Sequence, residues 1–341
     1  MAKYTVMILH EGGKPLVAER LEIPIPKPGE ALVRLQYAAL NHRDLWIRKG
    51  AYGNISGLPC VPGSDGFGTV KIVGSEADKH WMGSSVVLFP TLNWGDDDAA
   101  PLSAWRILGV PDSGTFAEYL LVPVTQLFPA PKGLSPQEAA ALPLAGVTAH
   151  RALFRRGGLK AGEKVLITGI GGGAAHFLLQ FAAAAGAEVW VTSSSHEKID
   201  AAKKLGAKGG ILYSSESWAE ELKATAGAFD LCVDSAAGVG WNGICEVLKP
   251  GGRLVFFGAT RGAPQLPMRK IFFKQLSLLG TSMGSRLDFQ AMLEFVQEKK
   301  ICPVIDKVFP LEEAEAALQH MERGSQTGKI VLEVPKAESL P

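Results

Sequence analysis

The stretch that decides the fold is Lys164–Ala174, which reads KVLITGIGGGA. A short apolar strand runs directly into a glycine-rich turn, and an alanine-rich helix follows. In this context Gly169 permits a tight turn, Gly171 lets the backbone approach a pyrophosphate, and Ala174 lets the helix pack closely on the strand. A flexible turn is the alternative interpretation. The residues expected to hold a dinucleotide here are Gly169, Gly171, Gly172, Gly173 and Ala174.

Strands and helices alternate after this turn. Apolar runs at 188–192, 229–233 and 253–257 indicate strands, and helical segments at 174–185 and 196–205 each stop at a glycine. Alternation at this spacing is typical of an α/β protein with a doubly wound parallel sheet.

The N-terminal and C-terminal parts of the chain have a different sequence pattern. The first 125 residues are β-rich, with short apolar stretches separated by Pro and Gly. After Gly284 the pattern is mixed and ends in a predicted strand at Lys329–Val334. We therefore expect a dinucleotide-binding domain over 126–283 and a second domain formed by 1–125 and 284–341.

Composition restricts the class of protein. The 341 residues are 47% hydrophobic and 20% charged, which is ordinary for two globular domains. A net charge of +1 gives no electrostatic footprint for nucleic acid or for an anionic membrane, and no apolar run is long enough to span one. The four cysteines are isolated, which argues against a disulfide framework and a clustered metal site. We expect a cytoplasmic protein.

The end of the second predicted strand discriminates between cofactors. It reads TSSSHEK over 192–198, and Glu188 lies at the wrong end of the strand to bind an adenosine ribose. Ser193, Ser194 and Lys198 suit a 2′-phosphate, so we expect NADP(H). The serines could instead cap the next helix, and one of them could do both.

Four further stretches carry a family resemblance. They are 39–44 (ALNHRD), 62–68 (PGSDGFG), 114–119 (GTFAEY) and 143–149 (PLAGVTA). With the order of the domains, they make the chain similar to the medium-chain dehydrogenase/reductase superfamily over nearly its whole length. The resemblance implies a β-rich catalytic domain of the GroES-like type beside a Rossmann domain.

The departures from that superfamily concern zinc. Its zinc alcohol dehydrogenases have Cys, His and Cys where this chain has Asn41, Ser64 and Ala145. The lobe that holds a second, structural zinc corresponds to 91–98 and contains no cysteine. We therefore expect no metal at either place, and a resemblance to the zinc-free branch of quinone oxidoreductases and enone reductases.

That resemblance implies roles for individual residues. Asn41 would lie beside the nicotinamide and the substrate carbonyl, His42 near the cofactor phosphates and Thr148 near the nicotinamide. Tyr52 would close over the site, and Trp46 and Trp94 would wall the substrate pocket. Residues at later strand ends that would border the cofactor are Gly258, Ala259, Ser282 and Met283.

The chemistry expected without a metal is hydride transfer from NADPH to a quinone or an α,β-unsaturated carbonyl. Neutral donors such as Asn41 and Tyr52 can stabilise a delocalised enolate, whereas a localised alkoxide normally needs a Lewis acid. Asn41 could instead bond a backbone turn, and Tyr52 could be a lid, with water as the proton donor. Two other functions stay open: a metal-free alcohol dehydrogenase or carbonyl reductase using Asn41, Thr148 and Tyr52, and a non-catalytic NADPH-binding protein.

The resemblance also implies an oligomer. In this superfamily the last strand of the nucleotide domain, here about 276–283, often pairs across a two-fold axis. We expect a homodimer, with a tetramer as the alternative.

Overall fold

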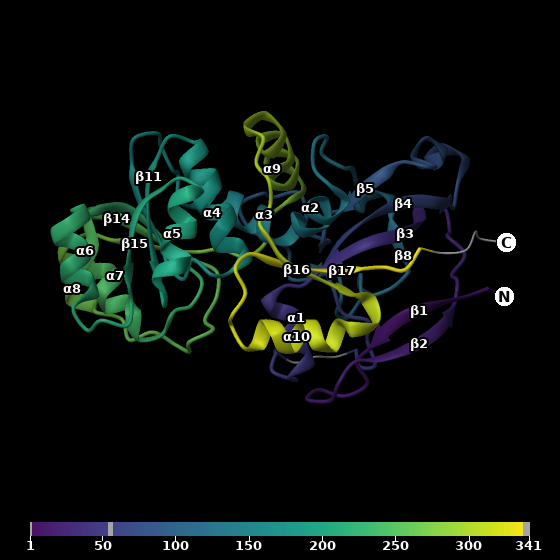
Figure 1. Ribbon diagram of the computed structural model, residues 1–341. Coiled ribbons are helices and arrows are strands. Elements are labelled where there is room, and N and C mark those ends of the chain that lie inside the picture. Colours follow the sequence, from purple (N-terminus) through teal and green to yellow (C-terminus); the bar gives the residue numbers. More distant parts are fainter. Residues whose placement is uncertain (1, 54–56, 337–341) are drawn as a thin grey trace. The chain divides into compact units, whose positions relative to one another are not determined.

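The structure is a computed structural model that describes residues 2–53 and 57–336. It divides into two compact units, one formed by 1–145 with 284–341 and the other by 146–283 (Figure 1).

The second unit is built on a six-stranded parallel sheet in the order β12-β11-β10-β13-β14-β15. The chain builds outward from β10 to β12, then returns to the other side of β10 and builds out to β15. This reversal between β10 and β13 is the switch point of a doubly wound sheet and confirms the predicted α/β fold. The strands are β10 (Lys164–Ile167), β11 (Glu188–Ser193), β12 (Ala207–Leu212), β13 (Phe229–Asp234), β14 (Leu248–Phe256) and β15 (Ser277–Gly280).

Helices flank this sheet (Figure 1). They are α4 (Gly173–Ala184), α5 (His196–Lys204), α6 (Trp218–Ala226), α7 (Trp241–Val247) and α8 (Met268–Phe273). Helices α4 and α5 pack on β10, β11 and β12, while α6 and α7 share a core with Leu166 and Leu254. Val165, Leu166 and Ile167 are fully buried, as expected for a central strand covered on both faces.

Strand β12 was missed by sequence analysis. It contains Gly209 and Gly210, residues that usually weaken a strand. The structure gives the reason for Gly209: a Cβ there would lie 2.5 Å from the ring of Trp190 on β11. The indole therefore lies where a side chain on the neighbouring strand would otherwise be.

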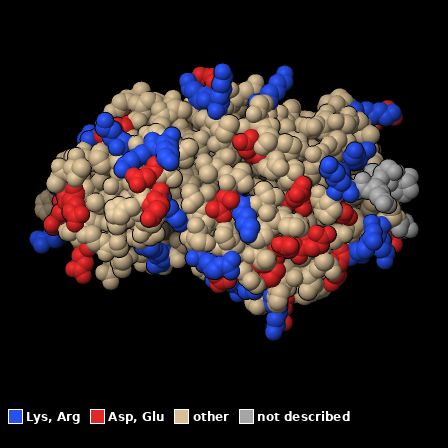
Figure 2. Space-filling view, in the orientation of Figure 1, with Lys and Arg blue, Asp and Glu red and all other residues tan. Residues whose placement is uncertain are grey.

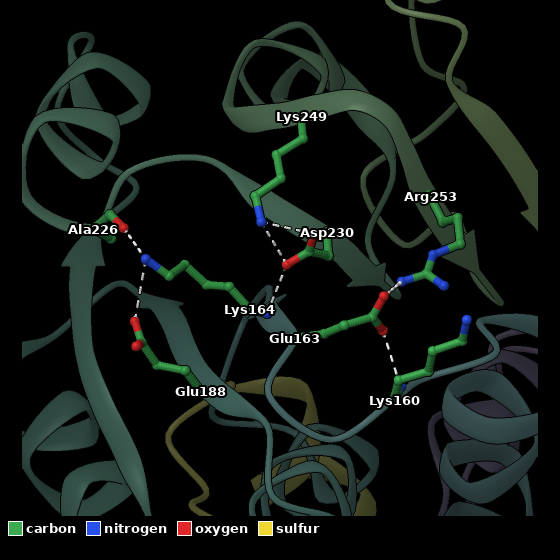
Figure 3. Close-up of polar contacts among 8 residues, drawn as sticks. All are labelled: Lys160, Glu163, Lys164, Glu188, Ala226, Asp230, Lys249 and Arg253. Atoms are coloured by element: carbon green, nitrogen blue, oxygen red, sulfur yellow. Dashed lines mark hydrogen bonds and ion pairs between the residues drawn. The ribbon is translucent and has the colours of Figure 1, made fainter.

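Ion pairs tie together the starts of these strands (Figure 3). Lys249 Nζ lies 2.7 and 2.8 Å from the two carboxylate oxygens of Asp230, which also accepts the Lys164 backbone N–H. Although burial opposes it, these hydrogen bonds hold the pKa of Asp230 below its usual value. Arg253 donates to Glu163 at 2.6 Å. The charged groups at this edge are thus paired with one another.

The first unit is built on a mostly antiparallel seven-stranded sheet, in the order β16-β17-β3-β4-β5-β9, with β8 also paired to β3. Its strands are β3 (Glu30–Ala39), β4 (Asp65–Val73), β5 (Ser85–Leu88), β8 (Tyr119–Pro123), β9 (Leu127–Pro129), β16 (Ile305–Pro310) and β17 (Lys329–Glu333). Two small hairpins add β1 (Lys3–Ile8) with β2 (Val17–Glu22), and β6 (Thr91–Leu92) with β7 (Arg106–Ile107).

The helices of the remaining chain are α1 (His42–Arg48), α2 (Pro136–Ala141), α3 (Pro143–His150), α9 (Arg286–Lys299) and α10 (Ala314–Glu322). Short 3-10 turns cover Glu76–Trp81, Val124–Gln126, Gly238–Gly240 and Leu311–Glu313, and a π-helical turn, Arg151–Arg156, continues α3.

The expected domain boundary at residue 126 falls too early. Residues 126–145 belong to the first unit because α2 packs against β3, β4 and β17. The Leu144 backbone N–H also donates to Asp65 Oδ1 at 2.7 Å. The change from a β-rich to a helical sequence pattern marks the start of α2. This helix comes before the boundary between the two units.

The surface carries charges of both signs. On the face shown in Figure 2, Lys and Arg side chains alternate with Asp and Glu, in keeping with the net charge of +1. No helix in the described ranges combines the length and the apolar character needed to cross a membrane.

Candidate active site

The glycine-rich turn is held against the end of β11. Gly169 has a φ of 66°, which a residue with a side chain rarely adopts. Its N–H donates to Thr192 Oγ1 at 3.2 Å, and the N–H of Ile170 donates to the Thr192 carbonyl oxygen at 3.0 Å. Helix α4 then begins with Gly172 as its N-cap. The local fold is the strand, turn and helix that the sequence predicts.

The outer side of this turn is open. A Cβ built on Gly169 or on Gly172 meets no atom within 4 Å. The first amides of α4, a helix of 12 residues, have no intrahelical acceptor and favour an anion at this end. The turn therefore fits the pyrophosphate of a dinucleotide, with room for the backbone to approach it closely.

The loops after β13, β14 and β15 lie at the same, carboxyl edge of the sheet. Asp234, at the end of β13, accepts hydrogen bonds from Thr168 Oγ1 at 2.5 Å and from the Ala237 N–H at 2.7 Å. Gly258 follows β14, and a Cβ there would lie 2.4 Å from the Ser235 carbonyl oxygen. Only glycine allows that approach. Sequence analysis missed the anchoring role of Asp234.

The other residues expected at this edge lie in the same loops. Ala259 is exposed beside Gly258, and Ser282 and Met283 follow β15, where Ser282 is exposed and Met283 is buried. Ligands of doubly wound sheets bind outside the carboxyl ends of the strands. The sheet thus gathers these positions where a dinucleotide is expected.

The hydroxyl groups after β11 have separate tasks. Ser195 caps α5, accepting the Lys198 N–H at 3.3 Å, and the buried Ser193 Oγ accepts the Ser195 N–H at 3.2 Å. Ser194 is exposed and Lys198 is half-buried. Glu197, which sequence analysis did not consider, has its pKa lowered by its own backbone N–H and by Ser195. The serine N-cap is therefore real, and it is made by Ser195.

In the first unit, Asn41 is the N-cap residue of α1, and its backbone N–H donates to Asp44 Oδ2 at 2.7 Å as part of a capping box. Its Oδ1 accepts from Lys329 Nζ at 2.7 Å, and its Nδ2 donates to Asp65 Oδ2 at 2.9 Å. Asn41 therefore belongs both to the turn that begins α1 and to a buried group of polar side chains.

Lys329, the first residue of β17, is only 4% exposed. Its ammonium donates to the Leu40 carbonyl oxygen at 2.7 Å and to Asp65 Oδ2 at 2.9 Å, besides Asn41. An ammonium has three donors, so all of them are used. Asp65 is fully buried and paired with this ammonium. We call Asn41, Asp65 and Lys329 the lysine cluster.

A second polar group surrounds Arg43. Its Nη1 donates to Ser64 Oγ at 2.6 Å and to the Leu108 carbonyl oxygen at 2.7 Å, and its guanidinium lies 5.0 Å from the centre of the Tyr52 ring. The neighbouring Asp44 is completely buried, and this burial raises its pKa to about 6 although the charge of Arg43 opposes the shift. Ser64 is thus engaged with a cation.

The remaining candidates differ in exposure and in their neighbours. His42 is exposed, and Trp46 is half-buried with Lys49 Nζ 5.7 Å from its ring centre. Trp94 is buried in its own loop, 5.9 Å from the ring of Trp105. In the second unit Thr148 lies on α3 and is 5% exposed.

Comparison with known proteins identifies the family. The family described as "Alcohol dehydrogenase GroES-like domain" matches residues 27–132, and that described as "Zinc-binding dehydrogenase" matches 173–298. A zinc-type alcohol dehydrogenase-like protein of Leptosphaeria maculans is 36% identical, over 94% of this chain and 95% of its own. The chain belongs to the medium-chain dehydrogenase/reductase superfamily.

Other members of the superfamily carry several names. A zinc-type alcohol dehydrogenase-like protein of Schizosaccharomyces pombe is 37% identical, over 97% of this chain and 99% of its own. The quinone oxidoreductase of Mus musculus is 29% identical, over 91% of both chains. A crystal structure titled NAD-dependent alcohol dehydrogenase superposes with a TM-score of 0.92 at 36% identity, covering 98% of this chain and all of that one. The fold and the oxidoreductase class are therefore shown.

The zinc in the superfamily's names does not fit the residues present. A catalytic zinc takes three protein ligands from His, Cys and carboxylates. In residues 2–53 and 57–336, no three or more side chains of these kinds are grouped to hold a metal ion. At the positions where the family resemblance implies zinc ligands, this chain has Asn41, Ser64 and Ala145, and Asp65 is already paired with Lys329.

Sequence analysis did not find Lys329. At the start of a strand a lysine normally lies at the surface, and its partners Asp65 and Asn41 are 264 and 288 residues away. Only the strand order brings them together, so no local pattern points to the cluster.

The open side of the turn leads to a prediction for Gly172→Ala. The φ of Gly172 is −78°, which alanine adopts readily, so the midpoint of thermal unfolding should stay within about 2 °C of that of the wild type. The new methyl group should project into the pyrophosphate position and raise the dissociation constant for NADPH by about tenfold or more. A titration of the protein with NADPH, followed by protein and nucleotide fluorescence, measures this dissociation constant.

Gly240→Ala is the matched control, because a Cβ there also meets nothing within 4 Å and the φ of −67° is ordinary. It should bind NADPH as the wild type does. Equal affinities for the two variants would show that the turn does not hold the pyrophosphate.

Proposed function

We propose that the protein is an NADPH-dependent, zinc-independent oxidoreductase that transfers hydride to a quinone or an α,β-unsaturated carbonyl. The observation that carries this proposal is the lysine cluster. At the matched position of a metal ligand it presents an amide whose orientation is defined by a cation on one side and a carboxylate on the other.

Asn41 can stabilise the negative charge that hydride addition creates. Its Nδ2 group has two hydrogens, and one is used by Asp65. The other is available to the substrate's carbonyl oxygen. In a conjugated substrate the charge is spread over an enolate, for which a neutral donor in a site that excludes water supplies the needed stabilisation. NADPH supplies the hydride when bound.

Tyr52 is proposed to cover the substrate and to donate a second hydrogen bond or the proton that completes the reduction. Its ring lies against the Arg43 guanidinium and 36% of the residue is exposed. This contact with a buried cation gives the ring a defined position. An ordered water could deliver the proton equally well.

NADP(H) is the proposed cofactor. Ser195 accounts for the helix cap, and the exposed Ser194 and the Lys198 ammonium are the groups proposed to bind a 2′-phosphate. Ser193 is buried and supports the loop. The other proposed cofactor contacts are His42, Thr148, Gly169, Gly171, Gly172, Gly173, Ala174, Gly258, Ala259, Ser282 and Met283.

Reduction of a saturated carbonyl is the second candidate, because several relatives are named alcohol dehydrogenases. It would use the same Asn41 and Tyr52 donors, with Thr148, on a more localised negative charge. Trp46 and Trp94 remain proposed walls of the substrate pocket, although the ring of Trp94 already packs on Trp105.

A homodimer is proposed from the edge of the sheet. Among the described residues, β15 has a neighbouring strand on one side only, and Leu278 and Leu279 on it are half-buried. The adjacent α8 exposes Met268, Phe272 and Phe273, the last to 75%. An unpaired edge with such apolar neighbours is suited to a second copy of the chain.

The first test compares two substrates. On protein prepared with a chelator, a small cyclic enone should consume NADPH, while its saturated ketone should not. Asn41→Ala should lower kcat for the enone about 100-fold, since it removes the donor to the developing oxyanion. Ketone turnover alone would favour carbonyl reduction, and absence of any turnover despite NADPH binding would favour the non-catalytic function. Activity that a chelator abolishes would overturn the proposal.

The second test concerns the cofactor. The wild type should have a lower KM for NADPH than for NADH in the enone assay. Lys198→Ala should raise the KM for NADPH about tenfold and leave that for NADH unchanged, because only NADPH has the 2′-phosphate. Lys203→Ala, on the same helix and exposed, is the control. Equal effects of Lys198→Ala on both nucleotides would exclude this role.

The third test concerns assembly. Light scattering at micromolar concentration should give the mass of two chains, and replacing Phe272 and Phe273 together by Ser should shift the mass towards that of one chain. A wild-type mass of one chain would rule out the dimer and the tetramer alike.

A further inference from the structure

We propose that Lys329 is a positioning residue for catalysis: its buried ammonium fixes the Asn41 amide with the NH₂ group towards the substrate and polarises it as a donor. This inference rests on the proposed function, in which Asn41 donates to the substrate oxygen.

The cluster permits only one orientation of the amide. Lys329 can only donate hydrogen bonds, and an ionised Asp65 can only accept them. Oδ1 of Asn41 must therefore face the ammonium, and Nδ2 must face the carboxylate, as the distances of 2.7 and 2.9 Å show. The reversed amide would set NH₂ against NH₃⁺ and oxygen against carboxylate, losing both bonds.

The ammonium also strengthens Asn41 as a donor. A charged donor on the carbonyl oxygen of an amide draws electron density from its nitrogen, and hydrogen bonds in such a chain reinforce one another in a medium of low dielectric constant. Lys329 is 4% exposed, so water screens its charge little. The chain of bonds from Lys329 through Asn41 ends on the oxygen that becomes negative.

Structural need does not explain a lysine at this position. The next three residues of β17, 330–332, are fully buried and apolar, and replacing a buried ion pair by apolar side chains is often neutral or stabilising. The Asp65 Oδ1 atom already accepts the Leu144 N–H. All three hydrogens of this buried ammonium are directed at the carboxyl end of β3 and at Asp65. Its effect on the orientation and donor strength of the Asn41 amide explains this arrangement better.

A double-mutant cycle tests this coupling with wild type, Lys329→Met, Asn41→Ala and the double variant. We expect Lys329→Met to lower kcat for the enone about tenfold, with an unchanged dissociation constant for NADPH. In the Asn41→Ala background the same change should lower kcat less than about twofold, because the donor through which it acts is gone. The inference would be overturned if the reductions in kcat of the two single variants simply multiplied in the double variant. An unchanged kcat in Lys329→Met would overturn it as well.

Two further variants distinguish a loss of coupling from a loss of folded protein in the double-mutant cycle. Lys307→Met removes an exposed lysine from β16, the strand paired with β17, and should retain wild-type kcat. If Lys329→Met does not fold, Lys329→Gln replaces it in the cycle, since a glutamine amide can still donate to Asp65 without carrying the charge.

A spectroscopic measurement separates this inference from the proposed function. The two side-chain amide protons of Asn41, assigned by their loss in Asn41→Ala, should shift in the ¹H–¹⁵N spectrum of Lys329→Met and not in that of Lys307→Met. If no enone is reduced, the proposed function fails while this measurement still tests the contact. Unshifted protons would overturn the positioning role even in an active enzyme.

Discussion

The buried contact between Lys329 and the pair Asn41 and Asp65 is the constraint on which the candidate site depends. It follows from sheet register. Ala39 on β3 pairs with Asp65 on one side and with Val331 on the other. Continuing this antiparallel register by two residues sets Lys329 opposite Asn41, on the same face, because side chains alternate along a strand. A register shift of one residue in either strand pairing would place one of these side chains on the opposite face of the sheet and break up the lysine cluster.

How far the sequence leads can be judged from particular residues. The strand, turn and helix over 164–184 were predictable because the signals are local: an apolar run, a glycine with positive φ and an open helix terminus. β12 was hidden because Gly209 has a packing partner, Trp190, that no local pattern reveals. The role of Lys329 could not be predicted either, because its partners Asn41 and Asp65 lie far away in the sequence. Asn41 was found by resemblance, but its partners came only from the structure.

The first unit has the fold of the alcohol dehydrogenase GroES-like domain, and the polar side chains of the candidate site in it are paired with one another. Where the superfamily's zinc proteins have ligands, this chain has an amide held by an ion pair, and a serine hydroxyl held by Arg43. Each of these contacts is made within the fold, so the electrostatics of the site are built into the polypeptide. A fold of this kind can thus change its chemistry by exchanging a few side chains at constant register.

The lobe between β6 and β7 illustrates the same principle in a structural role. It contains no cysteine; instead Trp94 packs on Trp105, the Trp94 indole donates to the Asp97 carbonyl oxygen at 3.0 Å, and Arg106 is paired with Asp112. The lobe has no thiolate that could be oxidised or bind zinc. A change in the redox state of the surroundings therefore has no cysteine in this lobe on which to act.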